Sequence, residues 1–161
     1  MDNIVEAGVI VGIAALMIWA LRREFTRGKR AAAKWQQSVD AYAARDIDTA
    51  ERALRACVKL APTWAPAHRF LGRVLLERGS YREAEERVRF GADLEPRSAD
   101  GYIDLAQLYM ALPSPRESDS LDALEKALTC APGLRGELHQ FPLLAPLRAH
   151  PRFLAMISRE Q

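Results

Sequence analysis

The pattern of apolar and polar residues changes once along the chain, close to residue 31. Residues Ile4 to Leu21 are apolar except for Glu6. From Ala31 onward, apolar and small residues recur among charged ones at the spacing of helices, and this pattern repeats itself. The second part of the chain is therefore predicted to be helical and built from repeated units.

The repeat has a period of 34 residues. Leu54 recurs as Val88 and Pro62 recurs as Pro96, and intermediate positions correspond in the same way. Self-similarity at this period predicts a solenoid of antiparallel helix pairs, each of which buries its apolar face only by stacking on its neighbours. Proteins of this architecture are typically binding proteins rather than enzymes.

The second unit also matches a family pattern. The matching positions are Leu71, Gly72, Leu75, Gly79, Tyr81, Ala84, Val88, Gly91 and Pro96. This pattern resembles the tetratricopeptide repeat (TPR), and the resemblance implies three helix pairs at 31–64, 65–98 and 99–132. Pro132 lies 36 residues after Pro96, so two extra residues are expected in the Pro-rich turn at 112–115 of the third unit.

Residues 133–161 are predicted to cap the open end of the array. Pro151 can begin a last helix, with Phe153, Leu154 and Ile157 on its packing face. The predicted fold is thus all-α: a single transmembrane helix, a short α-solenoid of about three TPR helix pairs, and a C-terminal capping helix.

The apolar segment at 4–21 is predicted to be that transmembrane helix, preceded by a short external tail at 1–3. At about 1.5 Å per residue it spans roughly 27 Å, close to the thickness of a bilayer core. A signal peptide is the less favoured alternative, because the basic residues follow the apolar stretch and no small-residue cleavage site is present. A buried or interfacial helix is the other alternative.

Charge predicts the orientation of this helix. Five basic residues follow the apolar stretch within a predicted juxtamembrane linker at 22–30: Arg22, Arg23, Arg27, Lys29 and Arg30. Because lysine and arginine stay on the cytoplasmic side of a membrane, the TPR domain is expected to face the cytoplasm, with the N-terminus outside. The same cluster could bind anionic lipid head groups, although topology alone explains it. A composition rich in alanine, arginine and leucine is typical of a bacterial source, which implies the inner membrane.

The rest of the chain is electrically balanced. Of the 23 Lys+Arg and 21 Asp+Glu residues, five and three lie in the first thirty positions, which leaves 18 of each sign in 31–161. Nucleic-acid binding is therefore not expected, since it requires a basic surface.

The predicted transmembrane helix carries a possible packing face for another helix. Gly8, Gly12 and Ala15 are small residues at four- and three-residue spacing, a pattern that lets helix backbones approach closely in membranes. The alternative is that glycine is simply common in membrane helices.

Candidate catalytic chemistry is absent from the sequence. Cys57 and Cys130 stand at small or apolar repeat positions and are predicted to be reduced, structural thiols. The three histidines have no metal-ligand spacing, and no phosphate loop, nucleophile motif or paired-acid motif occurs. We expect no enzymatic activity, no metal, no cofactor and no small-molecule substrate.

The TPR resemblance implies a binding groove lined by the first helix of each pair. The residues carried over to the groove are Trp35, Val39, Tyr42, Arg69, Arg73, Leu76, Asp100, Ile103, Gln107 and Met110. Arg69 and Arg73 are expected to receive a peptide carboxylate, and Trp35 and Tyr42 to anchor apolar side chains. The chaperone-tail carboxylate clamp is not reproduced, because Trp35 and Val39 replace its Lys and Asn.

The sequence thus predicts a membrane-anchored scaffold or assembly factor that holds a protein partner of a membrane complex. A membrane protein is expected among its partners. One alternative is a constitutive structural subunit packed through the membrane helix and the array surface. A further alternative is a receptor that exchanges peptides or substrates transiently.

Overall fold

The computed structural model describes residues 2–158, with side chains described from residue 16 onward. Every described element is a helix. The order is α1 (Asp2–Ala43), α2 (Ile47–Leu60), α3 (Ala65–Glu77), α4 (Tyr81–Leu94), α5 (Ala99–Ala111), α6 (Glu117–Cys130), the 3₁₀ helices η1 (Pro132–Gln140) and η2 (Pro142–Ala149), and α7 (Pro151–Ser158).

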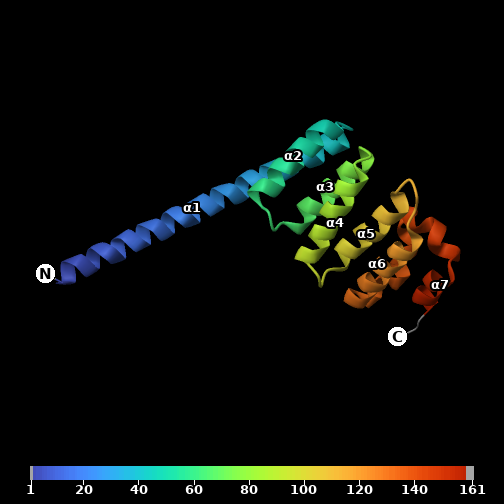
Figure 1. The fold of residues 1–161 in the computed structure, drawn as a ribbon. Coiled ribbons are helices and arrows are strands. Elements are labelled where there is room, and N and C mark those ends of the chain that lie inside the picture. The colour runs from blue at the N-terminus through green and yellow to red at the C-terminus, as the bar shows by residue number, and fades with distance from the viewer. Residues whose placement is uncertain (1, 159–161) are drawn as a thin grey trace.

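The helices form a stack of antiparallel pairs (Figure 1). α1 packs on α2, α3 on α4 and α5 on α6, while α2 contacts α3 and α4 contacts α5 to join successive pairs. The predicted all-α solenoid of three helix pairs is confirmed.

Small residues allow the helices to approach. Ala50, Ala84 and Ser120 are fully buried at equivalent positions of the three second helices. A Cβ atom added to Gly72 would lie 2.9 Å from the carbonyl oxygen of Ala84, so α3 and α4 are too close there for any side chain. Small residues are thus required at these positions for packing.

The turns within the first two pairs also correspond. Gly79, between α3 and α4, has φ of 76°, and Arg45, at the equivalent place between α1 and α2, has φ of 61°. Glycine adopts this left-handed conformation without steric cost, whereas arginine does not. The repeat geometry therefore imposes a backbone conformation that the residue type at position 45 disfavours.

The first helix differs from its prediction. α1 is a single helix from Asp2 to Ala43, so the linker predicted at 22–30 is helical and joins the N-terminal segment to the first repeat without a break (Figure 1). Arginine, lysine, glutamate and alanine are good helix formers, and no proline occurs before Pro62 to end the helix.

The structure gives no direct support for a transmembrane helix. Among the residues whose side chains are described, no helix is long and apolar enough to cross a membrane. Most of the predicted span, at positions 4–15, lies outside those residues.

The C-terminal residues close the third repeat as a cap, by a partly different surface from the predicted one. Leu138, Leu144 and Leu147 of the 3₁₀ helices are fully buried against the array. α7 packs through Phe153 and Met156, whereas Leu154 and Ile157 of its predicted packing face remain exposed. Phe153 and Met156 are three residues apart and so share one face of the helix.

Candidate peptide-binding groove

The first helices of the three pairs line two adjoining hollows, which together we call the groove. The first hollow, of about 280 Å³, is lined by residues of α1, α3 and α5. The second, of about 590 Å³, extends from the same helices to η2. Arg69, Arg73 and Asp104 line both hollows and therefore mark the boundary between them.

Aromatic side chains form one wall of the first hollow. The ring of Trp35 lies 5.1 Å from that of Trp64 and 5.5 Å from that of Phe70, measured between centroids. Tyr42 meets Phe70 edge-on at 5.2 Å. Val39 and Pro66 complete the apolar lining. Rings held against one another in this way offer a rigid apolar surface.

The boundary between the hollows is an ion-pair cluster. Arg69 Nε lies 3.0 Å from Asp104 Oδ2, and Arg73 Nη2 lies 3.4 Å from Asp104 Oδ1. Arg69 also approaches Glu95 at 3.4 Å and Asp100 at 3.7 Å. The Arg69 side chain is only 11% exposed, whereas that of Arg73 is 56% exposed. Arg69 is therefore surrounded by carboxylates of its own chain, and Arg73 is the accessible cation.

Asp104 ionises against the cost of burial. Burial raises the pKa of the Asp104 carboxyl above its usual value, although the charges of Arg73 and Arg69 act in the opposite direction. The two arginines are thus held in place by a carboxylate that sits where a ligand carboxylate was expected.

The second hollow combines apolar and polar groups. The hydroxyl of Tyr42 donates a hydrogen bond to Glu77 Oε1, which joins the end of α1 to the end of α3. Burial, followed by this contact with Glu77, raises the pKa of Tyr42. Leu143 and Pro142 of the cap line the far side, so η2 bounds the groove at the third repeat.

Most of the predicted groove residues lie where the TPR resemblance implied. Seven of the ten line the hollows: Trp35, Val39, Tyr42, Arg69, Arg73, Leu76 and Gln107. Asp100 lies at the edge, beside Arg69. Ile103 and Met110 are buried, with exposures of 6% and 8%, because α5 packs against α3, α4, α6 and η2 and has little free surface.

Several groove residues were not anticipated from the sequence, and Asp104, Phe70 and Leu143 are examples. Asp104 and Phe70 each lie next to a predicted groove position, and Leu143 belongs to the cap. The signal for Asp104 was its charge, opposite to Arg69 and Arg73 in the neighbouring unit. No repeat pattern predicts Leu143, because η2 lies outside the repeats.

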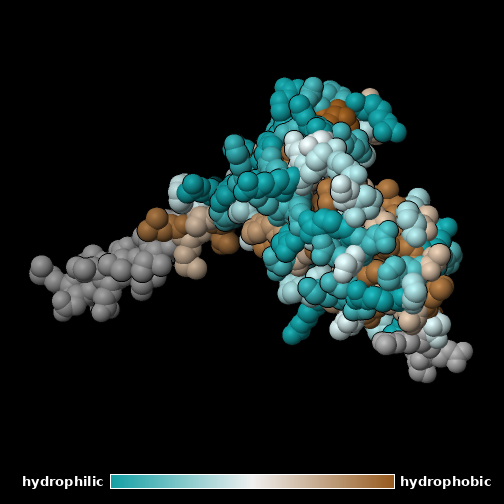
Figure 2. Space-filling view, turned by 45° about the vertical axis from the view of Figure 1, so that its right-hand side comes forward, coloured by the Kyte–Doolittle hydropathy of each residue, from teal (hydrophilic) through white to brown (hydrophobic). Residues whose placement is uncertain are grey.

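A second exposed surface lies on α1 where it leaves the array. Six large apolar side chains, 54–68% exposed, gather there (Figure 2): Leu16, Met17, Ile18, Trp19, Leu21 and Phe25. The basic residues lie among and after them. Arg23 stands over the ring of Trp19 at 5.4 Å and Lys29 over that of Phe25 at 4.5 Å.

The rest of the predicted basic cluster is also accessible. Arg22 and Arg30 are exposed, and Arg27 is half-buried and pairs with Glu24 at 3.2 Å. The predicted packing residues Gly8, Gly12 and Ala15 lie outside the residues whose side chains are described.

Cys57 and His68 have structural surroundings, whereas Cys130 is half-buried. Cys57 is buried, its Sγ lies 3.4 Å from the carbonyl oxygen of Ala31, and burial raises its pKa. His68 Nε2 lies 2.9 Å from the carbonyl oxygen of Pro62, and burial lowers its pKa. Within the described residues, no three His, Cys, Asp or Glu side chains are placed to hold a metal ion.

Comparison with known proteins supports the fold. No protein-family model and no curated protein matches the chain. Among solved structures, the MamA protein superposes with a TM-score of 0.61 at 18% identity, over 80% of this chain and 70% of that one. The TPR2B domain of yeast Sti1, in its complex with pHsp70, gives 0.63 at 16% identity, over 80% of this chain and 96% of that one.

A mutant O-GlcNAc transferase from Thermobaculum terrenum gives a TM-score of 0.58 at 24% identity. The match covers 73% of this chain but only 24% of the transferase, so this chain corresponds to a small part of that protein. At these identities the likeness concerns the fold, and it confirms a TPR-type solenoid.

Proposed function

We propose that this protein is a non-catalytic interaction module, which holds a protein partner in its TPR groove while α1 attaches it to a membrane. Its role is that of a scaffold or assembly factor for a membrane complex. The array lies on the cytoplasmic side of the membrane.

The observation that carries the proposal is the accessible surface of the groove. Two adjoining hollows, of about 280 and 590 Å³, expose aromatic and aliphatic side chains beside charged groups. Concave surfaces with apolar walls and a few placed polar groups are typical of binding sites. An extended peptide segment can place apolar side chains in both hollows and hydrogen-bond to the polar groups between them.

Support for membrane attachment comes from α1. Leu16 to Trp19 are four consecutive exposed residues, so every side of the helix is apolar there. A helix that is apolar on all sides is stable when it is surrounded by lipid or protein. The basic residues that follow favour the cytoplasmic side for the array.

A site-specific photocrosslinker tests the groove in intact membranes. A benzoylphenylalanine at Gln107, which lines the second hollow, should crosslink to a discrete partner. The same group at Arg82, whose side chain is 95% exposed on α4 outside both hollows, is the matched control and should not. Equal crosslinking from both positions would show that the partner does not bind specifically in the groove.

The membrane part of the proposal has its own test. The full chain should remain in the membrane fraction after carbonate extraction, and a phosphatase reporter at the C-terminus should be inactive if the array is cytoplasmic. Release of the chain by carbonate, or an active phosphatase, would contradict the attachment or the orientation respectively.

The exposed apolar residues of α1 also favour a second candidate function. A constitutive subunit could pack against a membrane complex through α1 and use the groove little or not at all. Such a subunit would co-purify in fixed ratio through high salt, whereas an assembly factor or transient receptor would be substoichiometric or salt-labile.

A further inference from the structure

We propose that the groove selects a basic segment with apolar flanks, of the kind found where a membrane protein's chain enters the cytoplasm. This inference rests on the proposed function, because it assumes that the groove binds a partner at the membrane. It reverses the sign of the ligand charge expected from the sequence, where Arg69 and Arg73 were to receive a carboxylate.

The balance of charge around the groove is negative. Two cations, Arg69 and Arg73, and two carboxylates, Glu77 and Asp104, line the hollows. Glu95 and Asp100 lie beside Arg69 at the edge and add two further negative charges. The positive charge of Arg45, in the turn after α1, also acts on Tyr42. It reduces the excess of negative charge around the groove without reversing it. Since 31–161 as a whole is balanced, this excess of carboxylates is a local property of the groove.

The arginines are already engaged by carboxylates. Asp104 lies between Arg69 and Arg73, and Arg69 has two further carboxylates within 3.7 Å. A ligand carboxylate would have to displace Asp104 or add a further negative charge beside it, and both are unfavourable. The predicted anion site is therefore occupied by the protein itself.

The accessible acceptors are placed for a cation. Glu77 accepts a hydrogen bond from Tyr42 through Oε1 and lines the second hollow. Asp100, 75% exposed, approaches Arg69 only at 3.7 Å. A lysine or arginine side chain could extend its aliphatic part along Leu76 and Leu143 and its charged end towards Glu77. Trp35 and Phe70 would accommodate apolar flanking residues.

Membrane topology supplies such a segment. The cytoplasmic loops of membrane proteins are enriched in lysine and arginine next to their apolar spans. An array attached by α1 would be held close to such loops, and its acidic, apolar-walled groove complements their charge and hydrophobicity. The partner chemistry is thus a basic juxtamembrane segment of another membrane protein.

Labelled synthetic peptides of equal length test whether the groove prefers a positively charged ligand. One alternates leucine with lysine, one leucine with glutamate and one leucine with glutamine, and each is titrated by fluorescence anisotropy with the full chain in a neutral detergent. The lysine peptide should bind most tightly, and its affinity should fall with added salt.

Matched variants locate the binding. Glu77→Gln with Asp100→Asn removes two negative charges from the groove and should weaken the lysine peptide about three- to tenfold, as expected for accessible ion pairs. Glu86→Gln with Asp93→Asn removes the same charge from α4, outside both hollows, and should change little.

The outcomes separate this inference from the proposed function. Preference for the glutamate peptide, abolished by Arg73→Gln, would overturn the basic-segment inference while supporting the groove as a binding site. Equal weakening by both double variants would also overturn it, since binding would then follow net charge alone. If no peptide binds, or if Val39→Trp and Gln107→Trp leave binding of every peptide unchanged, the groove itself fails.

Discussion

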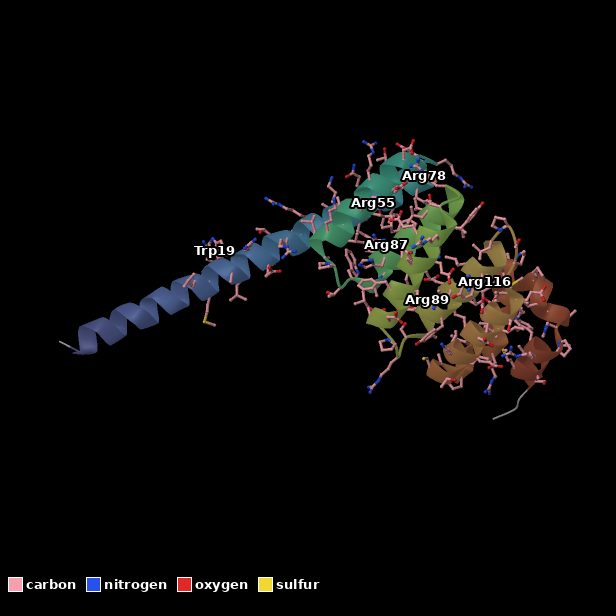
Figure 3. All side chains as sticks on the ribbon, viewed as in Figure 1. Trp19, Arg55, Arg78, Arg87, Arg89 and Arg116 are labelled. Carbon is pink, nitrogen blue, oxygen red and sulfur yellow. The ribbon has the colours of Figure 1, made fainter. Side chains whose placement is uncertain are left out.

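The two faces of the array use charge in different ways. On the face formed by the second helices, arginines link each helix pair to the next (Figure 3). Arg55 of α2 bonds to both oxygens of Glu83 of α4, at 2.6 and 2.8 Å. Arg116 before α6 bonds to Glu85 of α4 at 2.8 Å. In the groove, one partly buried carboxylate holds two arginines beside apolar surface that remains accessible.

This difference separates stability from binding. The ion pairs between second helices are half-exposed, and such pairs contribute little individually, so they mainly favour the correct register of the units. The groove cluster is more buried and its loss should cost more. Accessible apolar residues remain on the groove side because charge there is concentrated at the boundary of the hollows.

The largest predicted effect comes from the core between the two faces. Ala84 is fully buried where α4 approaches α3. Ala84→Phe should overpack this contact and reduce the free energy of unfolding by about 3 kcal/mol. Thermal unfolding followed by circular dichroism measures this change. An unchanged melting temperature would show that α3 and α4 are not in this register.

The next effect separates the groove from the outer face. Asp104→Ala removes both acceptor oxygens from Arg69 and Arg73 and should reduce the free energy of unfolding by about 2 kcal/mol. Urea unfolding of the full chain provides the measurement. Asp93→Ala is the control, since Asp93 is exposed on α4, and it should be nearly neutral. Equal stability of the two variants would mean that the groove cluster is not structural.

A smaller effect is expected on the outer face. Glu83→Gln weakens the contacts with Arg55 and Arg87, and because all three side chains are roughly a third exposed, the loss should be about 0.5–1 kcal/mol. The same urea experiment applies, and added salt should shrink the difference. A loss larger than that of Asp104→Ala would invert the comparison between the faces.

The smallest effect is a difference in acid sensitivity. The hydrogen bond from Arg55 lowers the pKa of Glu83, so its stabilising contribution is complete above its unfolded-state pKa and is lost as pH falls through the lower, folded value. Burial raises the pKa of Asp104, so ionising it costs stability, and that cost is relieved as pH falls through the raised value.

These opposite signs can be measured with two variants. Melting temperature recorded from about pH 6 to pH 3 should fall more steeply for Asp104→Asn than for the unaltered chain, and less steeply for Glu83→Gln. Identical slopes for the two variants would show that the groove and the outer face do not differ in this respect.

The repeat architecture could be predicted because it depends on local patterns. The positions of Ala50 and Ala84 follow from the period alone, since each helix must approach its partner in the same way. The groove was predicted less completely. A repeat pattern assigns residues to a face one helix at a time, so it identified Arg69 and Arg73 but not Asp104, which pairs with them from another unit.

Residues in the cap and in the helix that it covers were the least predictable. Ile103 and Met110 occupy groove positions of the pattern but are buried, because α5 is covered on one side by the cap. The packing face of α7 was partly wrong for a related reason. In so short a helix, Leu154 and Met156 are equally plausible by periodicity, and only the surface of the preceding 3₁₀ helices decides between them.

The continuity of α1 fixes the direction in which the groove opens. Trp19 near the exposed end and Trp35 in the groove wall belong to one helix, so the angle between them about its axis depends on the number of intervening residues. Each residue added between them would turn the array by about 100° and move it about 1.5 Å along the axis. The direction in which the groove faces, relative to the attached part of α1, therefore depends on the number of residues between the two. A flexible linker in this place would leave that direction undefined.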